Sequence, residues 1–119
     1  MPGKVLIIDD DNRNIFALVA TLRAKGYSCI TATSAAQGIA FLSEVSDISI
    51  VLLDMMMPEM DGYEALPKIK RQHRVPVIAV TAQAMVGDRE KCLAAGADDY
   101  ISKPIDVDRL LGVLTTHIK

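Results

Sequence analysis

Three short runs of branched apolar residues limit what this chain can fold into. They lie at residues 5–8, 50–53 and 77–80, and polar residues do not alternate with apolar ones in any of them. A strand this continuously hydrophobic must be covered on both faces, as parallel strands are in α/β proteins. The runs are also far shorter than the roughly 20 apolar residues that a membrane-spanning helix needs. The pattern therefore predicts buried parallel strands and no membrane span.

Segments with the spacing of helices separate these strands. Ser34, Asp88 and Asp106 stand where a second, a fourth and a fifth helix should begin, because such side chains suit a helix N-terminus. The third helix, around residues 63–71, contains Pro67, so we expect it to start late or to kink. The first helix has apolar residues at i, i+3, i+4 and i+7: Ile15, Leu18, Val19 and Leu22. The predicted strands are residues 4–8, 28–32, 48–53, 75–80 and 100–102.

The regular alternation of strands and helices predicts an α/β fold with a doubly wound, five-stranded parallel sheet. The simplest strand order is 2-1-3-4-5. In such a sheet, ligands bind outside the carboxyl ends of the strands, beside the point where the strand order reverses. The residues that directly follow the strands are therefore the candidates for a functional site.

Length and composition narrow the function further. With 119 residues the chain fits a single domain, residues 1–119, and we expect no output domain. A formal net charge of −2 does not suit a protein that binds nucleic acid directly. The first residues lead straight into a strand without a signal peptide, so we expect a cytoplasmic protein. Cys29 and Cys92 lack the spacing of metal ligands, and we expect buried thiols.

The residues at the strand ends are mostly acidic or hydrogen-bonding. Carboxylates that converge there repel one another and either take up protons or bind a cation. Asp11 suits the N-terminus of a solvated helix and needs no further role. The other strand-end residues are Asp9 and Asp10 after the first strand, Asp54 after the third, Thr81 and the small Ala82 after the fourth, and Lys103 after the fifth.

These residue types suit metal-assisted phosphoryl transfer. Mg²⁺ prefers one or two carboxylates together with other oxygen ligands, and Asp10, Asp54 and the carbonyl of Met56 would supply them. Beside such a metal, Asp54 would act as a carboxylate nucleophile toward phosphorus. Lys103 and Thr81 would stabilise the charge on the transferred oxygens.

The chain resembles a response-regulator receiver domain over essentially its whole length. The matching stretches are VLIIDDD at residues 5–11, VLLDMMMPEMDG at 51–62, VIAVTAQAMVGDRE at 77–90 and AGADDYISKP at 95–104. The resemblance implies a flavodoxin-like topology and a domain that accepts a phosphoryl group from a phosphohistidine. Parts of the last two stretches resemble the receivers of hybrid histidine kinases in particular.

The resemblance also implies a role for each site residue. It makes Asp54 the phosphoacceptor and Tyr100 the aromatic residue that changes rotamer with the phosphorylation state. Lys103-Pro104 is expected to be a cis peptide. The metal ligands would be Asp9, mainly through water, and Asp10, Asp54 and Met56; the phosphoryl-binding residues would be Met55, Thr81, Ala82 and Lys103, and Thr81 would also be the switch hydroxyl.

The same resemblance implies protein partners. The phosphoryl donor would be a histidine kinase or a histidine phosphotransfer protein, and a downstream protein target would read the changed surface. No direct contact with nucleic acid or membrane is expected. The sequence is compatible both with a stand-alone receiver and with a domain of a hybrid kinase.

Three other functions compete with this one. A flavodoxin-like cofactor protein needs a phosphate cradle after the first strand, where this chain has three aspartates that would repel a bare phosphate. A phosphatase with an aspartyl nucleophile usually has a second carboxylate two residues later, where this chain has Met56. A degenerate receiver that only binds proteins would not need the complete set of acids, threonine and lysine.

Some of the remaining candidate residues allow two interpretations. Tyr100 is either the switch aromatic or a packed core tyrosine. Loss of the phosphoryl group requires an attacking water. Met56 would exclude this water and Gln83 could not act as a general base toward it, so we expect a long-lived phosphorylated state. His73 and His117 are expected to be ordinary surface residues. The methionines of the acidic loop either contact a partner or fill gaps: Met55, Met56, Met57 and Met60.

Overall fold

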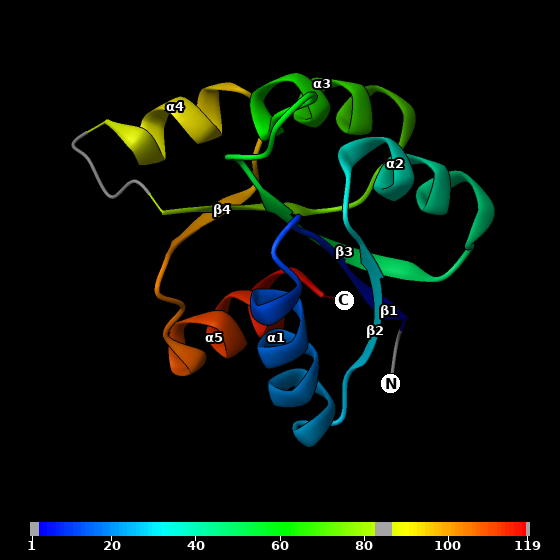
Figure 1. Ribbon diagram of the computed structural model, residues 1–119, viewed down its shortest axis with the longest axis vertical. Coiled ribbons are helices and arrows are strands. Elements are labelled where there is room, and N and C mark those ends of the chain that lie inside the picture. The colour runs from blue at the N-terminus through cyan, green and yellow to red at the C-terminus, as the bar shows by residue number, and fades with distance from the viewer. Residues whose placement is uncertain (1–2, 83–86, 119) are drawn as a thin grey trace.

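A parallel sheet forms the centre of the computed structural model, which describes residues 3–82 and 87–118 (Figure 1). Its strands follow the apolar runs of the sequence, and the central ones are almost wholly buried. Branched side chains favour extended backbone and pack well on a pleated surface. The strands are β1 (Lys4–Ile8), β2 (Ser28–Ala32), β3 (Ile48–Asp54), β4 (Val77–Thr81) and β5 (Asp99–Ser102).

The strand order is β2-β1-β3-β4-β5, with every neighbouring pair parallel, as the sequence predicts. The order reverses between β1 and β3, so the carboxyl ends of these two strands lie side by side. The first two strands match their predicted limits. Strand β4 begins two residues later than predicted, after Pro76, whose carbonyl accepts a hydrogen bond from the amide of Val51.

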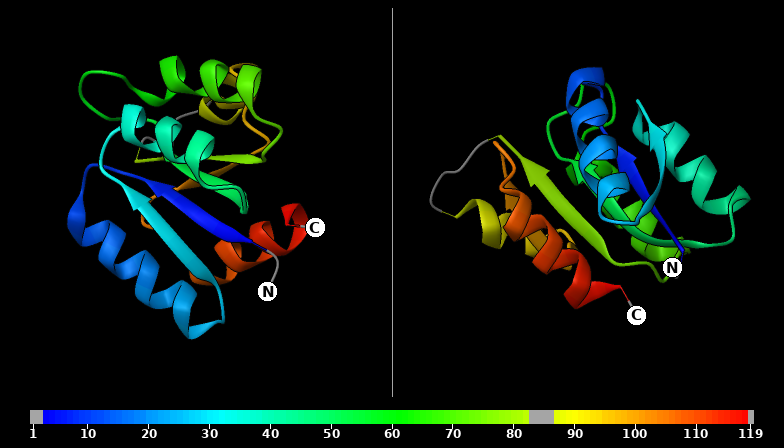
Figure 2. Two further views of the ribbon diagram at one scale, coloured as in Figure 1. Left: turned by 90° about the vertical axis from the view of Figure 1, so that its right-hand side faces the viewer. Right: turned by 90° about the horizontal axis from the view of Figure 1, so that it is seen from below.

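Helices cover both faces of the sheet (Figure 2). Alternate side chains of β1 divide between the two layers: Leu6 and Ile8 face one cluster, and Val5 and Ile7 face the other. The first cluster packs against the second, third and fourth helices, and the second cluster packs against the first and fifth helices. The helices are α1 (Asn12–Ala24), α2 (Ala35–Glu44), α3 (Gly62–Gln72), α4 (Asp88–Ala94) and α5 (Val107–His117).

Polar side chains cap the helices where the sequence predicts them. Asp11 accepts a hydrogen bond from the amide of Arg13 at the start of α1, which fits the interpretation of this residue as a helix N-terminus. Ser34 caps α2 in the same way, and Asp106 caps α5. Helix α4 begins at Asp88, as the sequence predicts, but its N-cap residue is Gly87, which has a φ of 93° and makes no side-chain cap.

The expectation of a late start for α3 is wrong. The carboxylate of Asp61 accepts a hydrogen bond of 2.9 Å from the amide of Glu64, and this cap starts the helix at Gly62. The helix then continues through the exposed Pro67 to Gln72. Buried contacts of Leu66 and Ile69 with the core hold the helix on both sides of the proline, so tertiary packing outweighs one missing backbone hydrogen bond.

The two cysteines are free thiols in different surroundings. Cys92 is fully buried in α4, and its Sγ lies 3.6 Å from the hydroxyl of Tyr63. Cys29 is only partly buried on the edge strand β2, where burial raises the pKa of its thiol. The buried-thiol prediction is therefore confirmed for Cys92 and holds only in part for Cys29.

Among the described residues, no helix is long and apolar enough to cross a membrane.

Candidate functional site

Two buried carboxylates lie at the reversal point of the sheet. Asp9 directly follows β1 and Asp54 ends the adjacent β3, with 2% and 4% of their surfaces exposed. The amide of Asp9 donates to the carbonyl of Ala32 at the end of β2, which fixes the turn that leaves the strand. The placement of both acids follows from the strand order, as the sequence predicts.

Asp10 joins these two residues to form an acidic cluster. One carboxylate oxygen from each of Asp9, Asp10 and Asp54 lies within 4.8 Å of the others, and Asp10 itself is exposed to solvent. In the part of the chain that the structure describes, these acids form the one group of three or more residues with the spacing of metal ligands. Hard carboxylate oxygens that repel one another at an open edge suit a divalent cation such as Mg²⁺.

Lys103 directly follows β5 and reaches this cluster along the same edge of the sheet. Its Nζ lies 3.4 Å from Oδ2 of Asp9 and 3.6 Å from Oδ2 of Asp54. The main chain holds the lysine in place, because the amide of Lys103 donates to the carbonyl of Thr81 at 2.8 Å. The following bond, Lys103-Pro104, is cis as expected. One ammonium group thus faces two buried carboxylates, which leaves the cluster short of positive charge.

The electrostatic balance at Asp54 favours protonation more than usual. Burial raises its pKa most strongly, and the negative charge of Asp9 raises it further. The amide of Met56, which donates to Oδ1 of Asp54 at 2.9 Å, and the charge of Lys103 act in the opposite direction. The net direction is upward, so the ionised Asp54 is energetically costly in this site without a further cation.

The loop after β3 gives the amides of Met55 and Met56 different hydrogen-bond partners. The side chain of Met55 is completely buried, and its amide donates to the carbonyl of Val80 at 2.9 Å, so Met55 presents no free donor at the site. The amide that faces Asp54 belongs to Met56, whose side chain is 48% exposed. Gly62 makes this loop path possible, because a Cβ there would lie 2.6 Å from Cα of Met55.

Asn14 also belongs to the site, although no motif of the sequence indicates it. Its Nδ2 donates to Oδ2 of Asp9, while the amide of Asp11 donates to Oδ1 of the same carboxylate at 2.9 Å. Both oxygens of Asp9 are therefore held by neighbours. Asn14 lies in the first turn of α1, the helix that directly follows the acidic end of β1. This position in the sequence is the feature that could have indicated its contact with the site.

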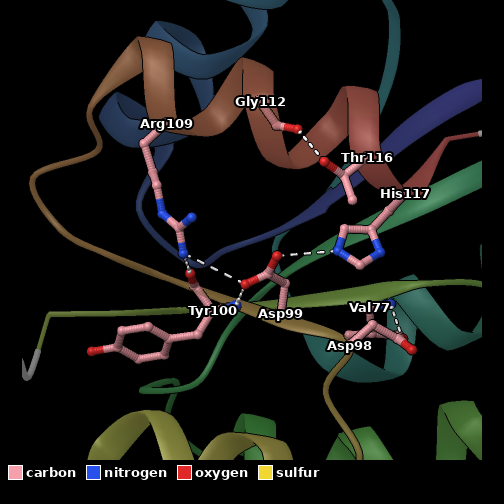
Figure 3. A network of polar contacts seen from close by, with 8 residues as sticks. All are labelled: Val77, Asp98, Asp99, Tyr100, Arg109, Gly112, Thr116 and His117. Atoms are coloured by element: carbon pink, nitrogen blue, oxygen red, sulfur yellow. Dashed lines mark hydrogen bonds and ion pairs between the residues drawn. The ribbon is translucent and has the colours of Figure 1, made fainter.

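Thr81 and Ala82 occupy the end of β4, as predicted. Thr81 is buried, and Ala82 is exposed beside it. Gln83, which is expected to lie near the attacking water, is outside the described residues. Tyr100 is half-buried on β5, with its ring on the side of the strand that faces α4 (Figure 3). Burial and the nearby Asp88 raise the pKa of the Tyr100 hydroxyl.

The two histidines are less ordinary than the sequence suggests. His117 at the end of α5 is mostly buried, and its Nε2 lies 3.1 Å from Oδ2 of Asp99 (Figure 3). His73 follows α3 and is half-buried with its Nε2 shielded from solvent. Both lie away from the acidic cluster, at the opposite end of the sheet. Neither histidine contributes to the site at Asp54.

This chain belongs to the family of response regulator receiver domains. The family model matches residues 5–115, which include all the strand-end residues described above. Receiver domains are components of two-component and phosphorelay signalling, and in general they are signalling domains rather than enzymes. Such domains generally bind Mg²⁺ at an acidic cluster, and the group of Asp9, Asp10 and Asp54 corresponds to one.

Individual relatives show the same relationship. The sensor histidine kinase RcsC of Escherichia coli strain K12 is 37% identical to this chain over 114 residues, covering 95% of this chain and 12% of RcsC. The heme response regulator HssR of Staphylococcus haemolyticus is 35% identical over 108 residues, covering 91% of this chain and 48% of HssR. The chain thus spans less than half the length of these curated relatives.

A solved structure matches the fold along almost the whole chain. It is the complex of the Saccharomyces cerevisiae histidine phosphotransfer signalling protein Ypd1 with the receiver domain of its downstream response regulator Ssk1. A chain of that complex aligns with a TM-score of 0.88 and 25% identity, covering 98% of this chain and 90% of its own length.

Proposed function

We propose that Asp54 accepts a phosphoryl group from a phosphohistidine in a reaction that requires Mg²⁺. The observation that carries the proposal is the convergence of Asp54 with Asp9, Asp10 and Lys103 at the carboxyl ends of the strands. Asp54 is the buried acid that the ammonium of Lys103 and the amide of Met56 both approach. A carboxylate placed among such groups is suited to attack phosphorus.

Asp10, Asp54 and the carbonyl of Met56 would hold the metal directly. Asp9 would act mainly through water, because both of its oxygens already accept hydrogen bonds from Asp11 and Asn14. When bound, Mg²⁺ offsets the negative charge that the carboxylates and the phosphoryl oxygens bring together.

In the transfer step, an oxygen of Asp54 forms a bond to phosphorus while the bond between phosphorus and the donor's imidazole nitrogen breaks. The electron pair of that bond returns to the imidazole. Lys103, the hydroxyl of Thr81 and the amide of Met56 would stabilise the equatorial oxygens, and the contacts of Lys103 and Met56 with Asp54 support this. We assign to Met56 the phosphoryl-binding role that was expected for Met55, because the amide of Met55 donates to the carbonyl of Val80. Ala82 leaves the donor room to approach.

The donor in this proposal is a histidine kinase or a histidine phosphotransfer protein in the cytoplasm. Two findings support a protein donor: RcsC is a sensor histidine kinase, and Ssk1 was crystallised with a phosphotransfer protein. Phosphorylation would then change the surface that a downstream protein target binds, with Tyr100 as the aromatic residue that changes rotamer.

The proposal is tested by incubating the protein with a small acyl phosphate and measuring its intact mass. We expect the mass of one phosphoryl group to be added in Mg²⁺ and not in EDTA, with peptide mapping placing the group on Asp54. Asp47→Asn, a change at an exposed acid that pairs with Lys4, is the control and should be labelled normally. Labelling at another residue, or labelling that persists in EDTA, would refute the proposal.

Replacing Thr81 with alanine should separate phosphorylation from its structural consequence. The variant keeps Asp54 and the metal ligands, so it should still be labelled, at a rate lower by about tenfold or less for the loss of one hydrogen bond. It should lose most of the phosphorylation-dependent amide shifts in α4, β5 and α5, because the hydroxyl that moves toward the phosphoryl group is missing. NMR spectra before and after labelling measure this, with Thr115→Ala as the exposed control. Identical shifts in wild type and Thr81→Ala would show that this coupling is wrong.

A further inference from the structure

Tyr100 lies in the outer strand of the sheet with its main-chain groups facing away from the other strands. Strand β5 pairs only with β4 in the described sheet, in a register that places Tyr100 opposite Ala79. The amide of Lys103 donates inward, to Thr81 of β4. Because main-chain groups alternate in direction along a strand, the groups of Tyr100 point to the open edge.

Side chains satisfy both of these outward groups. The amide of Tyr100 donates to Oδ1 of Asp99 at 2.8 Å, and Nη2 of Arg109 donates to the carbonyl of Tyr100 at 2.9 Å (Figure 3). Nη2 of Arg109 also lies 3.5 Å from Oδ1 of Asp99, which closes a ring of contacts around one residue. The two side chains thus occupy the positions that a neighbouring strand would take.

Helix α5 holds this arrangement at two points. Arg109 lies in its first turn and His117 is its last residue, and both contact the carboxylate of Asp99. Asp99 is mostly buried, and burial by itself would raise its pKa. Hydrogen bonds from Tyr100 and His117 and the charge of Arg109 outweigh burial and lower the pKa. The carboxylate is therefore ionised at neutral pH and can hold both side chains of α5.

We propose that Arg109 and Asp99 are positioning residues for Tyr100, fixing its main chain so that only its side chain moves when the domain is phosphorylated. This inference rests on the proposed function, in which Tyr100 is the switch aromatic. The contacts are suited to it because they engage the main chain on the α5 side of β5, while the ring lies on the side facing α4 (Figure 3). A strand fixed in this way converts a change near Thr81 into rotation of the ring rather than into sliding of the strand.

The experiment compares wild type, Arg109→Ala and Arg109→Lys, with Arg71→Ala as a control at an exposed arginine of α3. Hydrogen exchange of the Tyr100 amide is measured in the unphosphorylated protein, relative to the amide of Ile101. The ring is followed by 19F NMR of protein containing 3-fluorotyrosine, before and after labelling with acyl phosphate in Mg²⁺.

In Arg109→Ala we expect exchange of the Tyr100 amide to be about tenfold faster, as loss of a charged hydrogen-bond donor implies, with little change at Ile101. The displacement of the Tyr100 fluorine signal on phosphorylation should become smaller and broader. Arg109→Lys should restore both in part, because it keeps a charged donor. Asp99→Asn is a second variant and should behave like Arg109→Ala.

Equal exchange in Arg109→Ala and Arg71→Ala would overturn the proposal. Faster exchange with an unchanged ring displacement would also overturn it, because the contacts would then stabilise the strand without positioning the ring. A reduced displacement without faster exchange would overturn it as well, since the main-chain contacts would not be the cause. Failure of wild type to take up a phosphoryl group would instead refute the proposed function, while the exchange measurement would still test the contacts.

Discussion

Replacing Asp54 with asparagine is expected to abolish phosphoryl labelling and to make the unlabelled protein more stable. Labelling is lost because a neutral amide is a far weaker nucleophile than a carboxylate. Stability is gained because Asp54 is only 4% exposed and its ionised form is disfavoured, first by burial and then by the charge of Asp9. Lys103 does not lose its only partner in the variant, because it also lies 3.4 Å from Asp9.

The gain in stability should depend on pH with a definite sign. The pKa of Asp54 is higher in the folded protein than its ordinary value of 3.8. At pH values between the ordinary pKa and the folded-state pKa, the folded state therefore binds more protons than the unfolded state does. The contribution of Asp54 to the free energy of unfolding therefore falls as the pH rises through this window and is constant above it. Asp54→Asn should equal the wild type in acid and exceed it at pH 7 by about 1 kcal/mol, or roughly 4 °C in Tm.

Thermal unfolding in EDTA between pH 3 and pH 7 measures this difference. Asp47→Asn removes the same charge from an exposed position, where a hydrogen bond from Lys4 lowers the pKa of the acid, so its Tm should fall slightly. Added Mg²⁺ should raise the Tm of the wild type more than that of Asp54→Asn, because a ligand of the folded state stabilises it. A Tm of Asp54→Asn at or below that of the wild type at pH 7 would contradict the argument from burial.

The features that could be predicted from the sequence are those that depend on strand order. Continuous apolar runs identify β1, β3 and β4, and alternation with helices gives the order of the sheet. Once β1 and β3 are neighbours, Asp9 and Asp54 must lie side by side, since Asp9 directly follows β1 and Asp54 ends β3. Lys103 follows for the same reason, because the end of β5 lies at the same edge of the sheet.

The features that could not be predicted depend on the local path of the chain and on side-chain rotamers. Two adjacent methionines differ in role because the amide of Met55 donates to Val80 whereas that of Met56 faces Asp54. Only the course of the loop decides between them. The contact of Asn14 with Asp9 likewise depends on the rotation of α1 about its axis.

Long-range polar contacts also could not be predicted from the sequence. His117 and Asp99 are 18 residues apart, and their contact follows from the packing of α5 on β5.

The proline of α3 shows the opposite case, in which a strong local signal was overruled. The cap from Asp61 and the buried contacts of Leu66 and Ile69 start and hold the helix in spite of Pro67.

The exposed side chain of Met56 leads to an expectation for the lifetime of the phosphorylated state. Loss of the phosphoryl group requires a water held in line with phosphorus, and Met56 stands two residues beyond the acceptor, with its amide bound to Asp54. A thioether is at best a weak hydrogen-bond acceptor and cannot act as a base, so it excludes water rather than orienting it. We therefore expect slow loss of the phosphoryl group, as suits a relay intermediate or a sustained signal.

Met56→Asn should shorten this lifetime by about tenfold. The amide of asparagine would hold the attacking water through one hydrogen bond, and one such bond made in the transition state corresponds to about a tenfold change in rate. The measurement is the decay of the purified phosphoprotein in Mg²⁺, followed by intact mass after the acyl phosphate is removed. Met56→Leu is the matched control: it keeps an apolar side chain of similar size, so its decay should equal that of the wild type. Decay in Met56→Asn that is no faster than in Met56→Leu would show that the side chain at this position does not protect the phosphoryl group, and the source of any long lifetime would then lie elsewhere in the site.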